Sequence, residues 1–215
     1  LNRINNMLKI TIIDYGAGNV RNVYRALSAI GIEALISQNQ DDILNSDGVI
    51  LPGVGAAQDT MQHLAEKGLV NAIKDFVNDG KPFLGICMGL QALFDYSLEG
   101  GKQECLGLIP GKIVKFSGDL TVPHMGWNQI KIIKNHSLLK GIDNNSYFYF
   151  VHSFYPEPID NDVVLTTTEY GSDFASIVAK NNIYATQFHP EKSGEIGLLI
   201  YKNFIDIVKN STRSN

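Results

Sequence analysis

The sequence predicts an α/β fold, and three observations predict it. In the first half of the chain, short β-branched runs alternate with stretches of helical periodicity, which favours a mainly parallel sheet flanked by helices. In the second half, from Gly111 onward, strand-like runs follow one another with only turn residues between them, which favours additional antiparallel strands. An amphipathic stretch near the C-terminus is typical of a closing helix. We therefore expect a flavodoxin-like architecture with an antiparallel extension.

The first half supplies the parallel strands and their helices. The run KITIIDY at 9–15 ends at Gly16, and residues 19–30 place apolar side chains on one helical face. The other elements expected here are buried strands at 33–36, 48–51 and 82–86 and helices at 61–79 and 88–96. Because helices connect the strands, the strands should lie parallel to one another.

The second half supplies the antiparallel strands and the last helix. The strand-like runs lie at 112–116, 128–133, 147–151, 163–168, 175–179 and 183–187. The closing helix begins after Ser193 and Gly194 and should pack its apolar side on the sheet. That side carries Ile196, Leu199, Ile200, Phe204, Ile207 and Val208.

Composition restricts the class of protein. The 215 residues carry a net charge of −4, with 44% hydrophobic and 19% charged residues, so disorder and a strongly basic nucleic-acid surface are disfavoured. We expect one domain over 7–210 and regard 1–6 as an added or upstream remnant, because Met7 directly precedes the first strand. No apolar run is long enough for a bilayer, and two cysteines cannot build a disulfide framework, so we expect no membrane contact and a cytoplasmic location.

The segment PFLGICMGLQ at 82–91 has the strongest chemical signature. Gly85 and Gly89 flank Cys87 at the junction of a predicted strand and a predicted helix. This is the G-x-C-x-G form of the nucleophile elbow: the glycines permit a tight turn that exposes the thiol, and the helix N-terminus favours the thiolate. A buried structural cysteine is the alternative, and the flanking glycines argue against it.

A thiol nucleophile needs a base and a group that orients the base. In QFHPEKS at 187–193, His189 and Glu191 are two residues apart at the end of a predicted strand, so both side chains can leave one side of an extended segment. Alone, this tripeptide is typical of a surface turn. Paired with the elbow, it predicts that His189 contacts Cys87 and that Glu191 orients His189.

An oxyanion also needs backbone donors. The segment LPGVG at 51–55 follows a predicted strand whose carboxyl end shares the sheet edge with the nucleophile. Gly53 and Gly55 would let the main chain turn, so the N–H groups of Val54 and Met88 are the candidate donors. A Pro-Gly turn without function fits the local sequence equally well. Its occurrence together with the elbow favours the oxyanion hypothesis.

Two other kinds of site fit the sequence poorly. Residues 16–21, GAGNVR, follow a strand and open a helix, but Arg21 stands where a dinucleotide site needs its third glycine. Ile36 and Ser37 stand where the ribose-binding acid should be. The histidines are scattered and Cys105 has no neighbour with ligand spacing. We expect neither a cofactor nor a metal.

GICMGLQ together with QFHPEKS resembles the class I glutamine amidotransferases, in which Cys, His and Glu hydrolyse the side-chain amide of glutamine and release ammonia. Two further segments, DYGAGN at 14–19 and VPHMGWN at 122–128, narrow the resemblance to the amidotransferase subunits of imidazole glycerol phosphate synthases. PGVGA at 52–56 and YFVHS at 149–153 agree with it. The resemblance covers residues 8–208.

The resemblance implies that Cys87 is the nucleophile and His189 the base and later the acid, oriented by Glu191. Gln91 and the PGVG backbone would hold L-glutamine. The implied partner is a (β/α)₈-barrel cyclase, which uses the ammonia to make imidazole glycerol phosphate and an aminoimidazole carboxamide ribonucleotide in histidine biosynthesis. Positions that match the family's interface are Asn19, Pro123, His124, Met125, Trp127, Tyr149 and Lys192.

Other functions are compatible with parts of this pattern. A stand-alone Cys-His hydrolase or peptidase of similar fold would use the same elbow, act without a partner and leave VPHMGWN without a purpose. An amidotransferase subunit of another biosynthetic synthase would keep the triad. A non-enzymatic interaction module would keep the interface and not need the thiol. Without the resemblance, Trp127 would be a core residue and Lys192 a solvated charge.

Overall fold

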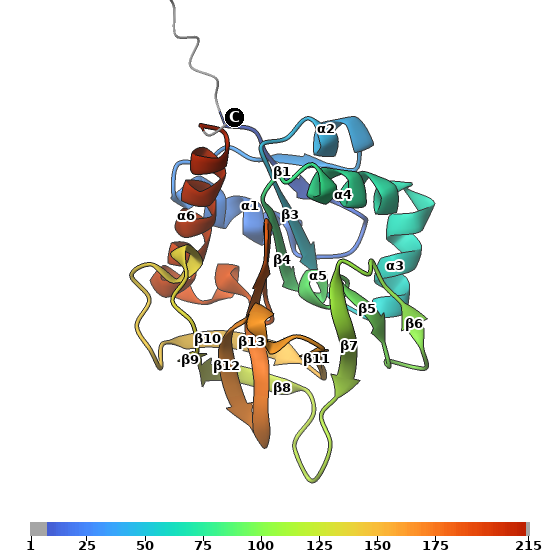
Figure 1. Cartoon of the computed structure of the whole chain (residues 1–215), viewed down its shortest axis with the longest axis vertical. Helices are drawn as coiled ribbons and strands as arrows, with labels where there is room; N and C mark the ends of the chain where they lie inside the picture. Colours follow the sequence, from blue (N-terminus) through green and yellow to red (C-terminus); the bar gives the residue numbers. More distant parts are fainter. Residues whose placement is uncertain (1–7, 214–215) are drawn as a thin grey trace, which may run out of the picture.

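An eight-stranded sheet organises the chain, which we describe for residues 8–213 of a computed structural model (Figure 1). The expected remnant at 1–6, and Met7, lie outside the described residues. The strand order is β2-β1-β3-β4-β14-β13-β12-β9. These strands are β1 Ile10–Ile13, β2 Leu35–Ser37, β3 Gly48–Gly53, β4 Phe83–Cys87, β9 Lys131–Ile132, β12 Val164–Tyr170, β13 Ser172–Lys180 and β14 Ile183–Thr186.

The sheet has a parallel half and an antiparallel half. Strands β2, β1, β3, β4 and β14 are parallel, in the order typical of flavodoxin-like sheets, and β13, β12 and β9 follow antiparallel. The predicted fold class is thereby confirmed. β14 pairs antiparallel with β13, as expected of the second half, and its other edge pairs parallel with β4, which was not expected. This pairing carries the C-terminal motif to the same sheet edge as the elbow.

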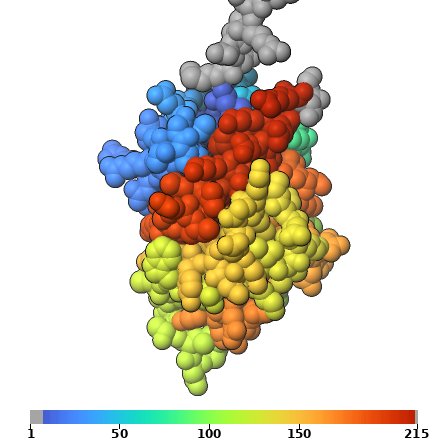
Figure 2. All heavy atoms as spheres, turned by 90° about the vertical axis from the view of Figure 1, so that its left-hand side faces the viewer, coloured from blue at the N-terminus to red at the C-terminus, as the bar shows by residue number. Residues whose placement is uncertain are grey.

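Helices cover both faces of the sheet. Helices α1 (Val20–Ala29) and α6 (Gly194–Ser211) pack on the face that carries Ile10, Ile12 and Ile50. Figure 2 shows α6 in red running across this side of the molecule, next to the blue part of the chain that includes α1. The opposite face, with Ile13, Val49 and Leu51, packs against the second set of helices. That set is α2 Gln40–Leu44, α3 Ala57–Glu66 and α4 Leu69–Asn78.

Two smaller sheets complete the fold. One has the order β11-β7-β5-β6, and the other is the two-stranded ribbon β10-β8. Their strands are β5 Phe94–Ser97, β6 Gln103–Glu104, β7 Ile109–Lys115, β8 His124–Gln129, β10 Tyr147–His152 and β11 Phe154–Pro158. Short helical segments are α5 Met88–Gln91, η1 Ser137–Leu139, η2 Asn161–Val163 and η3 Pro190–Lys192. No helix within residues 8–213 has the length and apolarity needed to cross a membrane.

Four predicted elements were wrong in detail. The helix expected at 88–96 ends at Gln91 because the next residues form β5, which pairs with β6 and β7. The helix expected at 61–79 is two helices, separated at Gly68, whose φ of 68° breaks the helical path. The strand expected to be buried at 33–36 is the sheet edge β2, with Leu35 50% exposed. The strand expected at 128–133 is divided between β8 and β9, which belong to different sheets.

Candidate active site

The turn at Cys87 depends on two glycines that allow neighbouring backbones to approach closely. Cys87 has φ 53° and ψ −106°, a conformation that costs an ordinary residue about 1–3 kcal/mol. A Cβ at Gly89 would lie 1.9 Å from the Leu51 carbonyl oxygen, and a Cβ at Gly85 would lie 2.7 Å from the Gly89 carbonyl oxygen. The strand end, the elbow and α5 can therefore approach one another only with glycine at these positions.

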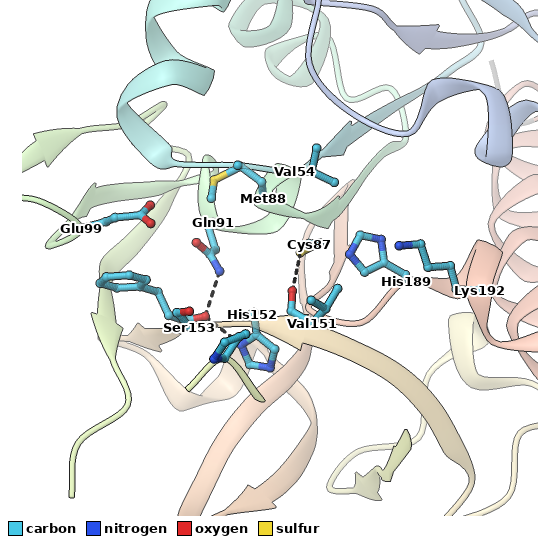
Figure 3. Close-up of a pocket in the computed structure, with 13 residues that line it drawn as sticks. Val54, Cys87, Met88, Gln91, Glu99, Val151, His152, Ser153, His189 and Lys192 are labelled. Atoms are coloured by element: carbon cyan, nitrogen blue, oxygen red, sulfur yellow. Dashed lines mark hydrogen bonds between the residues drawn. The ribbon is translucent and has the colours of Figure 1, made fainter. Parts of the chain in front are cut away.

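The segment that carries His189 and Glu191 reaches Cys87 through the register of β14 on β4. Thr186 pairs with Ile86, so the chain beyond Thr186 continues beside Cys87. Figure 3 shows the His189 ring next to Cys87. The Nδ1 atom of His189 lies 2.8 Å from Oε1 of Glu191, and the buried Nε2 atom has no hydrogen-bond partner among the described residues. The ring therefore keeps one nitrogen for chemistry at the sulfur.

Charge decides the protonation of His189. Burial alone lowers the pKa of this imidazole, but the negative charge on Cys87, followed by the hydrogen bond and the charge of Glu191, raises it to about 10. The side chains of His189 and Glu191 are 2% and 1% exposed, so water screens this interaction little. The site thus favours an imidazolium between two groups that can carry negative charge.

Backbone and hydroxyl contacts fix the base. The His189 N–H donates to the Tyr149 carbonyl at 3.0 Å, and the Ser193 hydroxyl donates to the His189 carbonyl at 2.7 Å. The Tyr201 hydroxyl donates to Oε2 of Glu191 at 3.3 Å, so both carboxylate oxygens have a partner. These contacts come from β10, from the start of α6 and from its buried side, which places the base independently of any ligand.

A pocket of about 370 Å³ opens beside the sulfur. Its lining residues are Val54, Gly55, Cys87, Met88, Gln91, Glu99, Pro123, Val151, His152, Ser153, Phe154, His189 and Lys192. Gln91 donates from Nε2 to the Phe154 carbonyl at 2.9 Å and to Oε1 of Gln187 at 3.2 Å, which leaves its own buried Oε1 without a partner. Figure 3 shows that this oxygen is turned toward Glu99. The pocket therefore presents free acceptors on the side away from His189.

The predicted oxyanion segment lies against the elbow. Gly53 pairs with Cys87 in the register of β3 on β4, and a Cβ at Gly53 would lie 2.6 Å from the Met88 Cβ. Val54, Gly55 and Met88 line the pocket together with the nucleophile. Both residues whose N–H groups are the candidate donors, Val54 and Met88, thus lie at the pocket. No group of three or more His, Cys, Asp or Glu side chains within residues 8–213 could hold a metal ion.

The seven predicted interface residues differ in exposure and in their neighbours. Met125 and Trp127 are 62% and 56% exposed, and Lys192 lies over the Tyr149 ring at 5.7 Å. Trp127 makes an edge contact with Tyr149 at 6.2 Å between ring centroids. Trp127 and Lys192 thus both contact Tyr149, and Met125 lies two residues before Trp127 on the same side of β8. Of the other three predicted interface residues, Pro123 lines the pocket, Asn19 directly precedes α1, and His124 is buried beneath the ribbon.

Several residues at the site had no role in the sequence-based prediction, and four of them have polar side chains that bear on the argument below: Glu99, His152, Gln187 and Tyr201. Gln187 could have been found, because it lies two residues before His189 in an extended segment and so faces the same side. The other three come from β5–β6, β10 and α6, and no local pattern connects them to the elbow.

Comparisons with known proteins agree with this geometry. The glutamine amidotransferase class-I family matches residues 11–207. The imidazole glycerol phosphate synthase subunit HisH of Dehalococcoides mccartyi is 47% identical over 91% of this chain and 95% of its own. HisH of Methanocaldococcus jannaschii is 47% identical over 93% of this chain and 100% of its own.

Solved structures share the fold at low identity. The structure of PurLQS from Thermotoga maritima superposes with a TM-score of 0.74 at 20% identity, covering 94% of this chain and 99% of that one. A glutamine amidotransferase from the same organism gives a TM-score of 0.61 at 14% identity, covering 97% of this chain and 85% of that one. The chain belongs to the class I glutamine amidotransferases and, within them, to the HisH subunits of imidazole glycerol phosphate synthase.

Proposed function

We propose that this protein hydrolyses L-glutamine to glutamate and ammonia through Cys87, His189 and Glu191, and delivers the ammonia to a cyclase subunit in histidine biosynthesis. The observation that carries the proposal is the elbow cysteine beside a buried His189–Glu191 pair at the wall of the pocket. The HisH relatives support the place of this reaction in imidazole glycerol phosphate synthase.

The first half of the reaction makes a thioester. The Cys87 thiolate attacks the side-chain amide carbon of glutamine, and the carbonyl oxygen becomes an oxyanion. The N–H groups of Val54 and Met88 are the proposed donors to that oxygen. His189, whose raised pKa makes it an imidazolium, gives its Nε2 proton to the leaving nitrogen. The C–N bond then breaks, and ammonia leaves with the glutamyl group held on sulfur.

The second half hydrolyses the thioester. His189, now neutral, takes a proton from a water molecule, whose oxygen attacks the thioester carbon. The new tetrahedral intermediate uses the same donors, and its collapse releases glutamate and returns the electron pair to sulfur. Glu191 keeps the ring oriented through Nδ1 throughout both halves.

The free acceptors of the pocket fit the other end of the substrate. The unpartnered Oε1 of Gln91 and the carboxylate of Glu99 lie on the side of the pocket away from His189 (Figure 3). Oε2 of Glu99 accepts from the Ala57 N–H at 2.9 Å, which fixes the carboxylate and leaves Oε1 available. Two converging acceptors suit the α-ammonium group of glutamine.

We propose that the partner is a (β/α)₈-barrel cyclase that binds the exposed group formed by Met125, Trp127, Tyr149 and Lys192. Exposed aromatic and methionine side chains in one group are typical of an interface. Pro123 lies two residues before Met125 and lines the active-site pocket, so the pocket and this face are neighbours. We further propose one domain over 7–210 and a cytoplasmic location, where both free cysteines remain reduced.

The test measures glutamate release by the purified chain, alone and with a (β/α)₈-barrel cyclase and its nucleotide ligand. We expect slow release alone and faster release with the liganded cyclase, because uncoupled hydrolysis wastes glutamine. The Cys87→Ala variant should lose at least about 10⁴-fold in rate while still binding the cyclase in gel filtration. Retained turnover in Cys87→Ala would refute the mechanism, and equal rates with and without the cyclase would refute the coupling.

A further inference from the structure

Cys87, His189 and Glu191 are neighbours in that order, and the first and the last of them each have one further hydrogen-bond donor. At one end, Nε2 of Gln187 lies 3.8 Å from Sγ of Cys87 and donates to it. At the other, the Tyr201 hydroxyl donates to Oε2 of Glu191 at 3.3 Å. Gln187 and Tyr201 are fully buried. The proposed mechanism gives no role to Gln187 or to Tyr201.

We propose that Gln187 and Tyr201 are positioning residues of the triad, each a neutral donor that stabilises one of its two anions. The proposal rests on the proposed function, because it concerns the thiolate form of Cys87 that the reaction needs. Each residue acts through a triad member, and the geometry gives neither a contact with the reacting carbon.

The charge balance of the site explains why two donors are needed. A thiolate and a carboxylate with one imidazolium between them leave one net negative charge where the side chains are almost fully buried. A buried anion needs hydrogen bonds in addition to an ion pair. His189 can satisfy one atom of each anion, and Gln187 and Tyr201 supply the second bond at sulfur and carboxylate.

The Gln187 amide is held in the orientation that presents its N–H to sulfur. Its Oε1 accepts from Nε2 of Gln91 at 3.2 Å, and that same Nε2 also donates to the Phe154 carbonyl at 2.9 Å. A rotated Gln187 amide would place two donors face to face, so rotation is disfavoured. The Gln187 backbone N–H donates to the Ser176 carbonyl at 2.8 Å, which anchors the residue at the end of β14.

The Tyr201 hydroxyl can serve only as a donor to Glu191. Burial and the neighbouring Glu191 carboxylate raise the pKa of Tyr201 well above its usual value, so the phenol keeps its proton. Among residues 8–213, Tyr201 is the hydrogen-bond partner of Oε2, while His189 takes Oε1. Loss of the hydroxyl would leave a buried carboxylate oxygen without a donor, which weakens the hold of Glu191 on the imidazolium.

The experiment measures how fast iodoacetamide alkylates Cys87 as a function of pH. The background is Cys105→Ser, so that only one thiol reacts. Gln187→Met and Tyr201→Phe keep most of the side-chain volume and remove the donor. We expect alkylation at pH 7 to slow about tenfold in Gln187→Met and about threefold in Tyr201→Phe, with both profiles moved to higher pH. With the cyclase present, kcat should fall and the KM for glutamine should stay within about twofold.

Matched variants separate positioning from packing. Tyr184→Phe removes the hydroxyl of another buried tyrosine, on β14, that has no contact with the triad, and its alkylation profile should equal that of the background. Gln187→Glu keeps the shape but places a carboxylate oxygen at sulfur, so alkylation should slow at least as much as in Gln187→Met. If Gln187→Met does not fold, Tyr201→Phe decides alone.

Unchanged alkylation profiles in folded Tyr201→Phe and Gln187→Met proteins would overturn the proposal. This result is distinguishable from a failure of the proposed function. Alkylation requires neither glutamine nor cyclase, whereas absence of glutamate release by the unmodified chain with its cyclase would contradict the glutaminase activity and leave the alkylation comparison valid.

Discussion

The catalytic edge of the sheet and the ribbon β8–β10 lie next to each other and are built in opposite ways. At the catalytic edge, backbones approach so closely that Gly85 and Gly89 have no room for a Cβ. The ribbon has one buried side with His124 and His152, and an opposite side on which Met125 and Trp127 are more than half exposed. The chain thus supplies Cys87, His189 and Glu191 itself, whereas the apolar side of the ribbon is left without a covering element within the described part of the chain.

This difference indicates where each kind of substitution should act. Changes at the catalytic edge should cost folding or chemistry, because every atom there has close neighbours. Changes on the exposed side of the ribbon should leave folding unaffected and act on association with the cyclase. The following expectations test that separation, beginning with the largest effect.

The largest effect is expected at Gly89. In Gly89→Ala the new Cβ would lie 1.9 Å from the Leu51 carbonyl oxygen, so β3 or the elbow must move. We expect a loss of at least about 3 kcal/mol in the free energy of unfolding, measured by urea titration. Gly100→Ala is the control: its Cβ meets no atom within 4 Å and only its φ of 69° is unfavourable, so a loss of about 1 kcal/mol is expected. Equal losses would contradict the packing argument.

The buried side of the ribbon should make the fold sensitive to acid. Asn128 donates to Nε2 of His124 at 3.1 Å, Nδ1 of His124 contacts Nε2 of His152 at 3.0 Å, and Nδ1 of His152 contacts the Phe154 carbonyl at 2.8 Å. Because a carbonyl only accepts, Nδ1 of His152 carries its proton and Nε2 accepts from His124. Both rings are satisfied only when they are neutral.

Burial lowers the pKa of His124 to about 4 and, with the neighbouring histidines, that of His152 to about 3. Below pH 6.5 the two histidines bind protons in the unfolded chain but stay neutral in the folded chain. The free energy of unfolding therefore falls as the pH falls from 6.5 toward 4. The loss is at most about 1.4 kcal/mol per pH unit for each histidine. Urea titrations at pH 6.5 and 5 measure it, and His152→Gln should reduce the slope. Equal unfolding free energies at the two pH values would contradict the neutral pair.

A smaller effect is expected on the exposed side of the ribbon. Trp127→Ala should leave the free energy of unfolding within about 0.5 kcal/mol, since the ring is 56% exposed. Its affinity for the cyclase should fall about 30-fold, or about 2 kcal/mol, because large aromatic side chains dominate interfaces. Ile159→Ala changes a side chain that is 77% exposed in the bend after β11, and it should not change the affinity. Calorimetric titration with the cyclase measures both variants.

The smallest effect is expected at Glu99, in the glutamine pocket. Glu99→Gln keeps an oxygen for the Ala57 N–H and loses the charge offered to the substrate's ammonium group. We expect KM for glutamine to rise about tenfold with kcat nearly unchanged, which is the result of lost uniform binding. A fall in kcat with constant KM would place Glu99 in the chemistry instead.

The sequence predicted the parallel half of the fold and the catalytic motifs because both depend on local patterns. Strand periodicity identified β1, β3 and β4, and the glycines around Cys87 identified the elbow. The helix expected through Tyr96 failed because Leu93 and Phe94 are buried in either a helix or a strand, and only the pairing of β5 with β7 decides between them.

Contacts between distant segments were out of reach of sequence patterns. Tyr201 meets Glu191 only because α6 returns along the sheet, and Glu99 reaches the pocket only because the chain turns after β5. His124 was expected near the partner surface, yet its side chain lies on the buried side of β8. Side chains alternate between the two sides of a strand, so His124 must face away from Met125 and Trp127, which are exposed.

The left-handed backbone at Cys87 sets activity against stability at one position. Glycine tolerates φ 53° without a Cβ, so Cys87→Gly relieves about 1–3 kcal/mol of strain and loses about 0.5–1 kcal/mol to the freer unfolded chain. The Cys87→Gly variant can therefore be more stable than the chain that carries the thiol. Selection for thermal stability alone would favour glycine at position 87 and so yield an inactive protein. Selection for ammonia production would retain the cysteine.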